Sequence, residues 1–214
     1  MQENNDLRSL RKNYELDQLL ESNIDKDPFV QFAKWFEVVI KEKLLEPNAM
    51  ILATATKNGI PSVRAVLLKE FDNTGFKFYT NYKSRKGIEI AENPFASALF
   101  LWLELERQIR IEGKIVKLSR KESLEYFNLR PLKSRYGALA SNQSEITNDR
   151  KTLEQRFNEL QKKYGDNPPM PGSWGGYKLI PNKFEFWQGR RDRLHDRICY
   201  EKSRSGWKIY RLQP

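Results

Sequence analysis

The residues best suited to chemistry in this sequence are cations and hydroxyls at the ends of predicted elements. Ser84 can cap a helix that begins with Arg85 and Lys86. Cations in the first turn of a helix oppose its macrodipole, unless an anion binds there to the free backbone N–H groups. The segment therefore predicts an anion site, with two solvated surface cations as the simpler alternative.

Two further segments could bind a phosphate. Arg64 lies within the apolar run SVRAVLLK, which ends at Lys69, and a buried charge of this kind needs a partner. Tyr126, Arg130 and Ser134 recur at intervals of four residues, so two hydroxyls and a guanidinium could converge on one phosphate. A solvated edge strand and a helix end with a surface arginine are the respective alternatives.

The segment RLHDR contains the only histidine of the chain, His195. If it is extended, Arg193, His195 and Arg197 share one face, and the flanking cations hold the imidazole neutral. A neutral imidazole can accept or donate a proton near neutral pH. A solvated strand face would explain the same pattern.

Aromatic and amide side chains accompany these cations. Trp187 ends the preceding strand, where an indole could flank a flat ring or simply fill the core. Gln143 and Ser144 lie in a polar loop and could contact the edge of a heterocycle, although a plain loop needs no ligand. Cations on several separate segments indicate more than one bound phosphate.

Composition limits the classes of protein that this chain can be. Its 214 residues carry 38 Lys+Arg against 28 Asp+Glu, a formal net charge of +10 that indicates an anionic partner. One cysteine and one histidine exclude a disulfide framework and Cys-cluster or multi-His metal sites, so we expect no metal. Without a signal peptide or an apolar span, we expect a cytoplasmic protein with no membrane association.

The elements that must position these residues are mainly strands, with flanking helices. A helix is expected to start at Pro28, and others at 84–92, 120–129 (behind a capping box, Ser119 to Glu122) and 148–164. Asn58-Gly59 predicts a hairpin turn, and we expect the strand at 96–103 to be buried on both faces. Strands are expected at 49–56, 62–69, 76–80, 96–103, 107–118, 177–180, 183–188, 194–202 and 207–212.

Antiparallel pairing and even spacing of these strands favour a small barrel over a doubly wound sheet. Residues 1–27 are polar and predict a mobile N-terminal arm. We expect residues 28–214 to form a single domain.

In their order along the chain, the motifs RAVLLK, FYTNYKSRK, ERQIRIEG, YFNLRP, SNQS, SWGGY, EFWQG, RLHDR and WKIYRLQP resemble the pyridoxine 5′-phosphate oxidase family. The resemblance covers about residues 11–214. It implies an antiparallel, FMN-binding split β-barrel, forming a homodimer with FMN at the subunit interface. It also implies oxidation of pyridoxine 5′-phosphate and pyridoxamine 5′-phosphate to pyridoxal 5′-phosphate. In that reaction a hydride passes to flavin N5, and oxygen reoxidises the flavin with formation of hydrogen peroxide.

The resemblance also implies roles for individual residues. Catalytic roles fall on His195, Arg193 and Arg197. The implied FMN contacts are Arg64, Ala65, Val66, Leu67, Leu68, Lys69, Tyr79, Thr80, Arg85, Lys86, Gln108, Gln143, Ser144, Trp187 and Arg197. The implied substrate contacts are Arg11, Lys12, Asn13, Tyr14, Lys69, Tyr126, Arg130, Ser134, Arg193, Leu194 and His195, with the arm closing over the substrate as a lid.

Some positions depart from the family pattern. Lys12-Asn13 stands where a second arginine and an acidic residue are often found, and Arg190-Arg191-Asp192 makes the loop before Arg193 unusually basic. Two alternatives remain open: a split-barrel FMN oxidoreductase with a different substrate, and a nucleic-acid-binding protein. The cations are scattered over strand ends, loops and a helix start, which favours discrete phosphates over the continuous basic surface that a nucleic acid needs.

Overall fold

The computed structural model describes residues 12–214. In chain order the elements are α1 (Pro28–Lys41), β1 (Ala49–Ala55), β2 (Pro61–Leu67), β3 (Glu70–Asp72), β4 (Gly75–Asn81), α2 (Arg85–Glu92), β5 (Phe95–Trp102), η1 (Leu103–Leu105), β6 (Arg107–Lys117), α3 (Arg120–Leu129), α4 (Leu132–Ala140), α5 (Arg150–Tyr164), β7 (Trp174–Gln188), η2 (Arg191–Arg193), β8 (Asp196–Ser203) and β9 (Gly206–Arg211).

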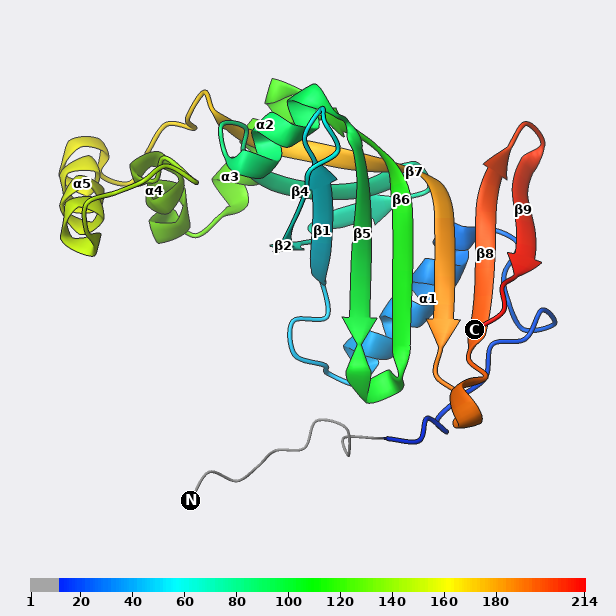
Figure 1. Ribbon diagram of the computed structural model, residues 1–214. Coiled ribbons are helices and arrows are strands. Elements are labelled where there is room, and N and C mark those ends of the chain that lie inside the picture. The colour runs from blue at the N-terminus through cyan, green and yellow to red at the C-terminus, as the bar shows by residue number, and fades with distance from the viewer. Residues whose placement is uncertain (1–11) are drawn as a thin grey trace, which may run out of the picture. The chain divides into compact units, whose positions relative to one another are not determined.

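The chain forms two compact units. Unit 1 comprises the residues up to Pro47 together with Phe100–Arg110 and Lys183–Pro214, and unit 2 comprises Asn48–Leu99 and Ile111–Asn182. Figure 1 shows the elements of both units. The division into an arm at 1–27 and one domain at 28–214 stays a prediction.

The strands are hydrogen-bonded in the order β2-β1-β5-β6-β7-β4-β3, and β8 pairs with both β7 and β9. The registers β1–β2, β1–β5, β3–β4, β4–β7, β7–β8 and β8–β9 are all antiparallel. These pairings confirm the predicted antiparallel, mainly β class.

Unit 2 follows the sequence signals closely. The β1–β2 hairpin turns at Asn58-Gly59, and its register pairs Ala49 with Leu67. Ser84 caps α2 by accepting a hydrogen bond from Gly87 N, and the capping box of α3 is complete. The helices α4 and α5 lie side by side, with the rings of Tyr136 and Phe157 5.9 Å apart (Figure 1).

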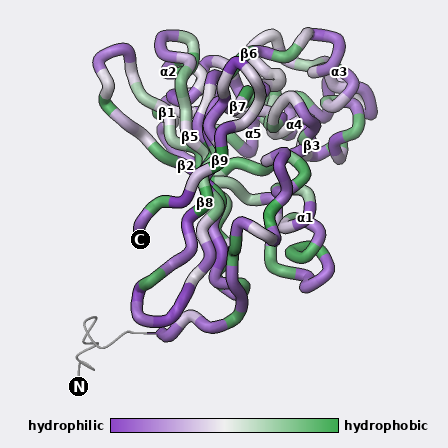
Figure 2. Tube along the Cα trace, turned by 90° about the vertical axis from the view of Figure 1, so that its right-hand side faces the viewer, coloured by the Kyte–Doolittle hydropathy of each residue, from purple (hydrophilic) through white to green (hydrophobic). Residues whose placement is uncertain are grey.

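Unit 1 is built around α1. Asp27 caps this helix by accepting from Phe29 N, and Pro28 occupies its first turn, as predicted. The tube in Figure 2 alternates between hydrophobic and hydrophilic residues along α1. Its apolar face contacts aromatic residues of the strands, with ring separations of 5.2 Å between Phe32 and Phe100 and 5.3 Å between Trp35 and Phe186.

Some of the predicted elements are wrong. The strand at 96–103 is not buried on both faces, because Phe100 and Trp102 are buried whereas Leu101 between them is exposed. The separate strands predicted at 177–180 and 183–188 form one strand, β7, that continues through Pro181. Gly113 permits this close pairing, since a Cβ there would lie 2.1 Å from the carbonyl oxygen of Ile180.

The helix α4 was not predicted, because Pro131 and Gly137 are typical of turns and loops. Pro131 instead lies just before the first turn of α4, where its missing N–H costs no helical hydrogen bond. No helix in the described part of the chain is long and apolar enough to span a bilayer.

Candidate functional site

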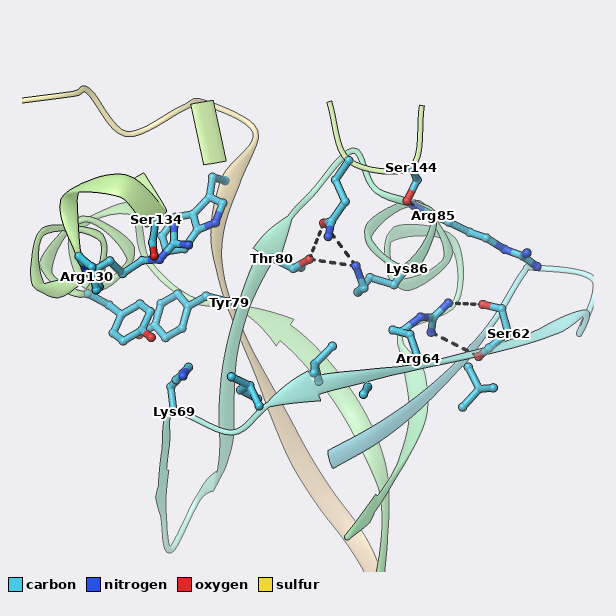
Figure 3. A pocket seen from close by; sticks show the side chains of 18 of the residues that line it. Ser62, Arg64, Lys69, Tyr79, Thr80, Arg85, Lys86, Arg130, Ser134 and Ser144 are labelled. Carbon is cyan, nitrogen blue, oxygen red and sulfur yellow. Dashed lines mark hydrogen bonds between the residues drawn. The ribbon is translucent and has the colours of Figure 1, made fainter. Parts of the chain in front are cut away.

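A cavity of about 780 Å³ lies in unit 2 and collects most of the predicted phosphate-binding side chains (Figure 3). Its volume falls within the range of about 300–1,000 Å³ typical of small-molecule sites. The predicted residues in its lining are Arg64, Ala65, Val66, Leu67, Lys69, Tyr79, Thr80, Arg85, Lys86, Tyr126, Arg130, Ser134, Gln143 and Ser144. Leu68 is not part of the lining and is buried in the core.

Lys86 is the most deeply buried cation of this cavity, with only 7% of its surface exposed. Its Nζ atom lies 3.1 Å from Thr80 Oγ1, 3.3 Å from Ser84 Oγ and 3.4 Å from Gln143 Oε1. Within residues 12–214 it forms no salt bridge with a carboxylate. Burial lowers the pKa of Lys86. A buried ammonium surrounded by neutral oxygens favours the binding of an anion.

Arg85 and Arg64 flank Lys86, and Glu89 joins them. Arg85 N donates to Ser144 Oγ at 3.2 Å, and Arg85 Nε donates to Glu89 Oε1 at 2.9 Å. Arg64 Nη2 lies 3.3 Å from the other oxygen of Glu89 and also donates to Ser62. We call Arg64, Thr80, Arg85, Lys86, Gln143 and Ser144 the Lys86 site.

Glu89 is a site residue that sequence reasoning missed. Burial alone would raise its pKa, but hydrogen bonds from Ser62, Thr54 and Arg85 lower the pKa of Glu89 to about 2. The available signal was its position four residues after Arg85, the spacing at which opposite charges meet on a helix. The carboxylate is therefore ionised and bridges two arginines.

The other group of cations in the cavity surrounds Arg130. Its guanidinium lies 4.9 Å from the ring of Trp174, and its Nη1 atom is buried without a hydrogen-bond partner among the described residues. Burial lowers the pKa of Arg130 and raises the pKa of Tyr126. Tyr126 stacks on Tyr79 at a ring separation of 3.9 Å. Lys69 and Ser134 line the same part of the cavity. We call Lys69, Tyr126, Arg130 and Ser134 the Arg130 site.

The two sites are separate within one cavity. In Figure 3, Arg130, Ser134 and Lys69 gather on one side of Tyr79, and Lys86, Arg85 and Arg64 lie on the other. Tyr126, Arg130 and Ser134 all line the cavity, from the end of α3 and the start of α4, although Pro131 interrupts the helix. Their convergence on one phosphate stays a prediction. The cavity can thus accept two anionic groups at different places.

The other predicted site residues belong to unit 1, where His195 is the centre of an aromatic cluster. The ring of His195 lies 4.6 Å from Trp187 and 5.7 Å from Tyr14. Arg190 N donates to His195 Nδ1 at 3.0 Å. Burial and the charge of Arg193 lower the pKa of His195, against the opposing effect of Asp196. The lowered pKa favours the neutral imidazole, but burial is the larger cause, and Arg193 contributes whereas the predicted effect of Arg197 is not among the causes.

The predicted extended conformation of 193–197 is wrong. Residues Arg191–Arg193 form the turn η2, and β8 begins only at Asp196. Arg193 has a φ of 64°, a left-handed conformation that no regular strand contains, so Arg193, His195 and Arg197 do not share a strand face. Arg197 Nε instead donates to Glu185 Oε1 at 2.8 Å.

The remaining predicted contacts of unit 1 are at its surface or in the arm. Gln108 is half-buried in β6, and Leu194 is 69% exposed. Lys12 forms a salt bridge of 3.3 Å with Glu106, and Asn13 is exposed. Arg11 lies outside the described residues.

Comparisons with known proteins show the family to which this chain belongs. A family model described as "Pyridoxamine 5'-phosphate oxidase" matches residues 36–164. The chain belongs to the pyridoxamine 5′-phosphate oxidase family. A second model, "Pyridoxine 5'-phosphate oxidase C-terminal dimerisation region", matches residues 174–214. The chain is therefore an oxidoreductase with the split-barrel fold of this family.

Its relatives match over nearly the whole chain. A pyridoxine/pyridoxamine 5′-phosphate oxidase of Paraburkholderia phytofirmans is 55% identical over 210 residues, covering 97% of this chain and 99% of the relative. One from Nostoc sp. strain PCC 7120 is 53% identical over 210 residues, covering 97% and 98%.

Two solved structures are similar to this chain as well. The crystal structure of PhzG from Burkholderia lata 383, in complex with tetrahydrophenazine-1-carboxylic acid, has a TM-score of 0.87 at 34% identity and covers 93% of this chain and 99% of its own. An FMN-binding protein from Nostoc punctiforme, related to pyridoxamine 5′-phosphate oxidase, has a TM-score of 0.68 at 17% identity. It covers 86% of this chain and 96% of its own, and shows the fold alone.

Proposed function

We propose that this chain oxidises pyridoxine 5′-phosphate and pyridoxamine 5′-phosphate to pyridoxal 5′-phosphate, with FMN as its cofactor and oxygen as the electron acceptor. The observation that supports this function is one cavity with two separate cationic sites, around Lys86 and Arg130. FMN and each substrate carry one phosphate ester apiece. An enzyme that holds both in contact needs two anion sites within one cavity.

The residues of the Lys86 site fit the phosphate of FMN. Lys86 is buried without an anionic partner among the described residues, and Ser144 and Thr80 add hydroxyls beside it. The proposed FMN contacts are the Lys86 site, the end of β2 from Ala65 to Leu67, Lys69 and Tyr79, and in unit 1 Gln108, Trp187 and Arg197. When bound, FMN would supply the redox chemistry: its N5 would accept a hydride, and oxygen would reoxidise it with formation of hydrogen peroxide.

The Arg130 site would hold the phosphate of the substrate. Arg130 has a guanidinium nitrogen with no protein partner in the described residues, and a phosphate oxygen would satisfy it. Lys69, Tyr126 and Ser134 would complete the anion site. Because this contact lies away from the reacting carbon, it would fix the position of the substrate ring through remote binding energy.

His195 and Arg193 would orient the reacting end of the substrate. Because Nδ1 of His195 accepts the Arg190 N–H, the neutral imidazole carries its proton on Nε2. His195 would therefore present a hydrogen-bond donor to the substrate, and Tyr14 would cover it from the arm. Arg197 would place positive charge near the flavin, where reduction adds electron density.

We also propose a homodimer with two FMN sites at the subunit interface. The match of residues 174–214 to a dimerisation region supports it. Sedimentation equilibrium should give a mass of two chains, whereas a single-chain mass at micromolar concentration would contradict this proposal.

The function is tested by mixing purified protein, FMN and pyridoxine 5′-phosphate under air and measuring aldehyde and peroxide together. We expect both products in equal amounts, and far less with pyridoxine, which lacks the phosphate for Arg130. Equal rates with and without the phosphate would contradict the substrate assignment. Oxidation of a tetrahydrophenazine carboxylic acid instead would favour the chemistry suggested by the ligand of PhzG.

A further inference from the structure

Glu106 is a buried carboxylate in unit 1 to which the proposed function assigns no role. It follows the turn η1 and precedes β6, and only 1% of its side chain is exposed. Its backbone is left-handed, with a φ of 54°, a conformation that costs free energy for a residue with a side chain. A buried charge held in a strained backbone needs strong compensating contacts.

The carboxylate of Glu106 holds the N-terminal arm. Its Oε2 atom accepts hydrogen bonds from Glu15 N at 2.8 Å and Leu16 N at 3.1 Å. Its Oε1 atom lies 3.3 Å from the ammonium of Lys12. Arg107, the next residue, forms an ion pair with Asp17 of the arm. The side chains of two adjacent residues therefore bind the arm from Lys12 to Asp17.

The main chain of Glu106 contacts the end of β7. Its carbonyl oxygen accepts from Gly189 N at 2.8 Å and from Gln188 Nε2 at 3.2 Å. Trp187 immediately precedes these residues and is in ring contact with His195. One residue thus joins the arm to the strand end that carries the aromatic cluster.

Tyr14 lies between these two sets of contacts. Its ring is 5.9 Å from Trp187 and 5.7 Å from His195. It packs so closely on Gly189 that a Cβ at that position would lie 2.7 Å from Tyr14 Cγ. Tyr14 directly precedes Glu15, and the N–H of Glu15 donates to the carboxylate of Glu106. This carboxylate therefore fixes the backbone that positions the ring of Tyr14.

We propose that Glu106 is a positioning residue, which holds Tyr14 against His195 and thereby sets the affinity for the substrate. Its effect on substrate binding rests on the proposed function of the site. Its effect on the place of Tyr14 does not, so the two are tested by different measurements.

The first measurement is the NMR spectrum of the imidazole in FMN-loaded protein labelled with ¹⁵N-histidine, in which His195 is the only histidine. Glu106→Ala should shift the His195 signals in the same direction as Tyr14→Leu, because both remove the ring from its neighbour. Glu104→Gln, on the exposed side of the same turn, is the matched control and should leave the signals unchanged. Unchanged His195 signals in Glu106→Ala would overturn the proposal, whether or not the protein oxidises any substrate.

The second measurement separates positioning from a general loss of structure. Glu106→Ala should raise KM for pyridoxine 5′-phosphate about tenfold or more, since two hydrogen bonds to an ionised acceptor are lost, with FMN affinity unchanged. Glu106→Gln keeps a carbonyl oxygen for both N–H groups and loses only the salt bridge to Lys12, which is exposed. The KM of Glu106→Gln for pyridoxine 5′-phosphate should therefore stay within about threefold of that of the parent protein.

Gly189→Ala provides a related test without substituting Glu106, although its new Cβ would also lie 3.0 Å from Glu106 Cβ. The added methyl group would displace Tyr14, so this variant should reproduce the raised KM and the shifted His195 signals. The role of Glu106 in substrate affinity would be overturned if Glu106→Ala lost FMN affinity as much as it raised KM. A normal KM in both Glu106→Ala and Gly189→Ala would also overturn it. If the unsubstituted protein has no oxidase activity, the proposed function is contradicted. The NMR measurement then still decides whether Glu106 positions Tyr14.

Discussion

Lys86→Met should stabilise the FMN-free protein and weaken FMN binding. Lys86 is 7% exposed, and the hydrogen-bond partners of its ammonium within residues 12–214 are neutral oxygens of Thr80, Ser84 and Gln143. Its desolvation is therefore only partly compensated, by these oxygens and by the nearby charge of Glu89, until an anion binds. Methionine has nearly the same length, and Thr80 keeps its hydrogen bond to Gln143 at 3.1 Å when the ammonium is removed.

The expected magnitudes follow from the loss of one buried charge. Replacing a buried charge by an apolar side chain of similar volume should add about 1 kcal/mol to the free energy of unfolding at pH 7. For a chain of this size, that corresponds to a rise in Tm of roughly 2–4 °C. A charge-assisted hydrogen bond contributes about 1.5–3 kcal/mol, so the Kd for FMN should rise roughly 10- to 150-fold.

The pH dependence has a definite sign. Because burial lowers the pKa of Lys86 below its usual 10.5, the unfolded chain binds more protons than the folded one between the two values. Stability from this group therefore rises with pH through that window and is lowest below it. Lys86→Met should remove this rise.

The assay combines thermal unfolding of the flavin-free protein with two titrations, one with FMN and one with riboflavin. Each titration is followed by the quenching of flavin fluorescence. Riboflavin lacks the phosphate and should bind Lys86→Met as it binds the parent protein. Lys83→Met removes an exposed lysine three residues away and is the matched control. A lower Tm in Lys86→Met, or equal weakening of FMN and riboflavin, would refute the assignment of Lys86 to the phosphate.

Other predictions concern the substrate, the histidine and the flavin. Arg130→Lys should raise KM for pyridoxine 5′-phosphate about 10- to 100-fold in steady-state assays, because lysine cannot supply two parallel donors to a phosphate; an unchanged KM would place the phosphate elsewhere. The folded-state pKa of His195 lies below its unfolded value of 6.5, so stability should fall as pH is lowered below 6.5. Urea unfolding at several pH values should show a weaker pH dependence of stability in His195→Asn, whereas an identical dependence would argue against a lowered pKa of this half-buried imidazole. Arg197→Met should lower the reduction potential of bound FMN by roughly 30 mV in a spectroscopic redox titration, equivalent to about 1.4 kcal/mol for two electrons. A constant potential would mean that Arg197 and its partner Glu185 act as a neutral pair.

The sequence alone was enough to locate most elements, because their ends carry specific local signals. Asp27-Pro28, Ser84 and the Ser119–Glu122 capping box all start helices where expected. The same local rules failed at α4 and β7, where Pro131 and Pro181 resemble breaks. Whether a proline ends an element depends on the hydrogen bond that its missing N–H would have formed, and this is set by distant segments.

The candidate site was predictable in its cations and unpredictable in the groups that hold them. Arg64, Arg85, Lys86 and Arg130 stand out because cations are rare in apolar runs and unfavourable at helix starts. Glu89 and Glu106 look like ordinary surface acids in the sequence. Only the fold brings Thr54 and Ser62 to Glu89, and the arm to Glu106.

An acid within an anion site requires a physical reason, and the charges around Glu89 provide one. Arg64, Arg85 and Lys86 would bring three positive charges together, and Glu89 reduces their sum to two. A phosphate monoester carries about −1.5 to −2 at pH 7, so the site with Glu89 matches the ligand more closely than the three cations alone. The carboxylate also fixes both arginines, because each donates to a different one of its oxygens. The negative charge of Glu89 opposes the binding of the phosphate, whereas the fixed positions that it gives to both arginines favour that binding. If the placement of the two arginines dominates, Glu89→Gln should therefore weaken the binding of FMN. Tighter FMN binding in this variant would show that repulsion between the carboxylate and the phosphate is the larger effect.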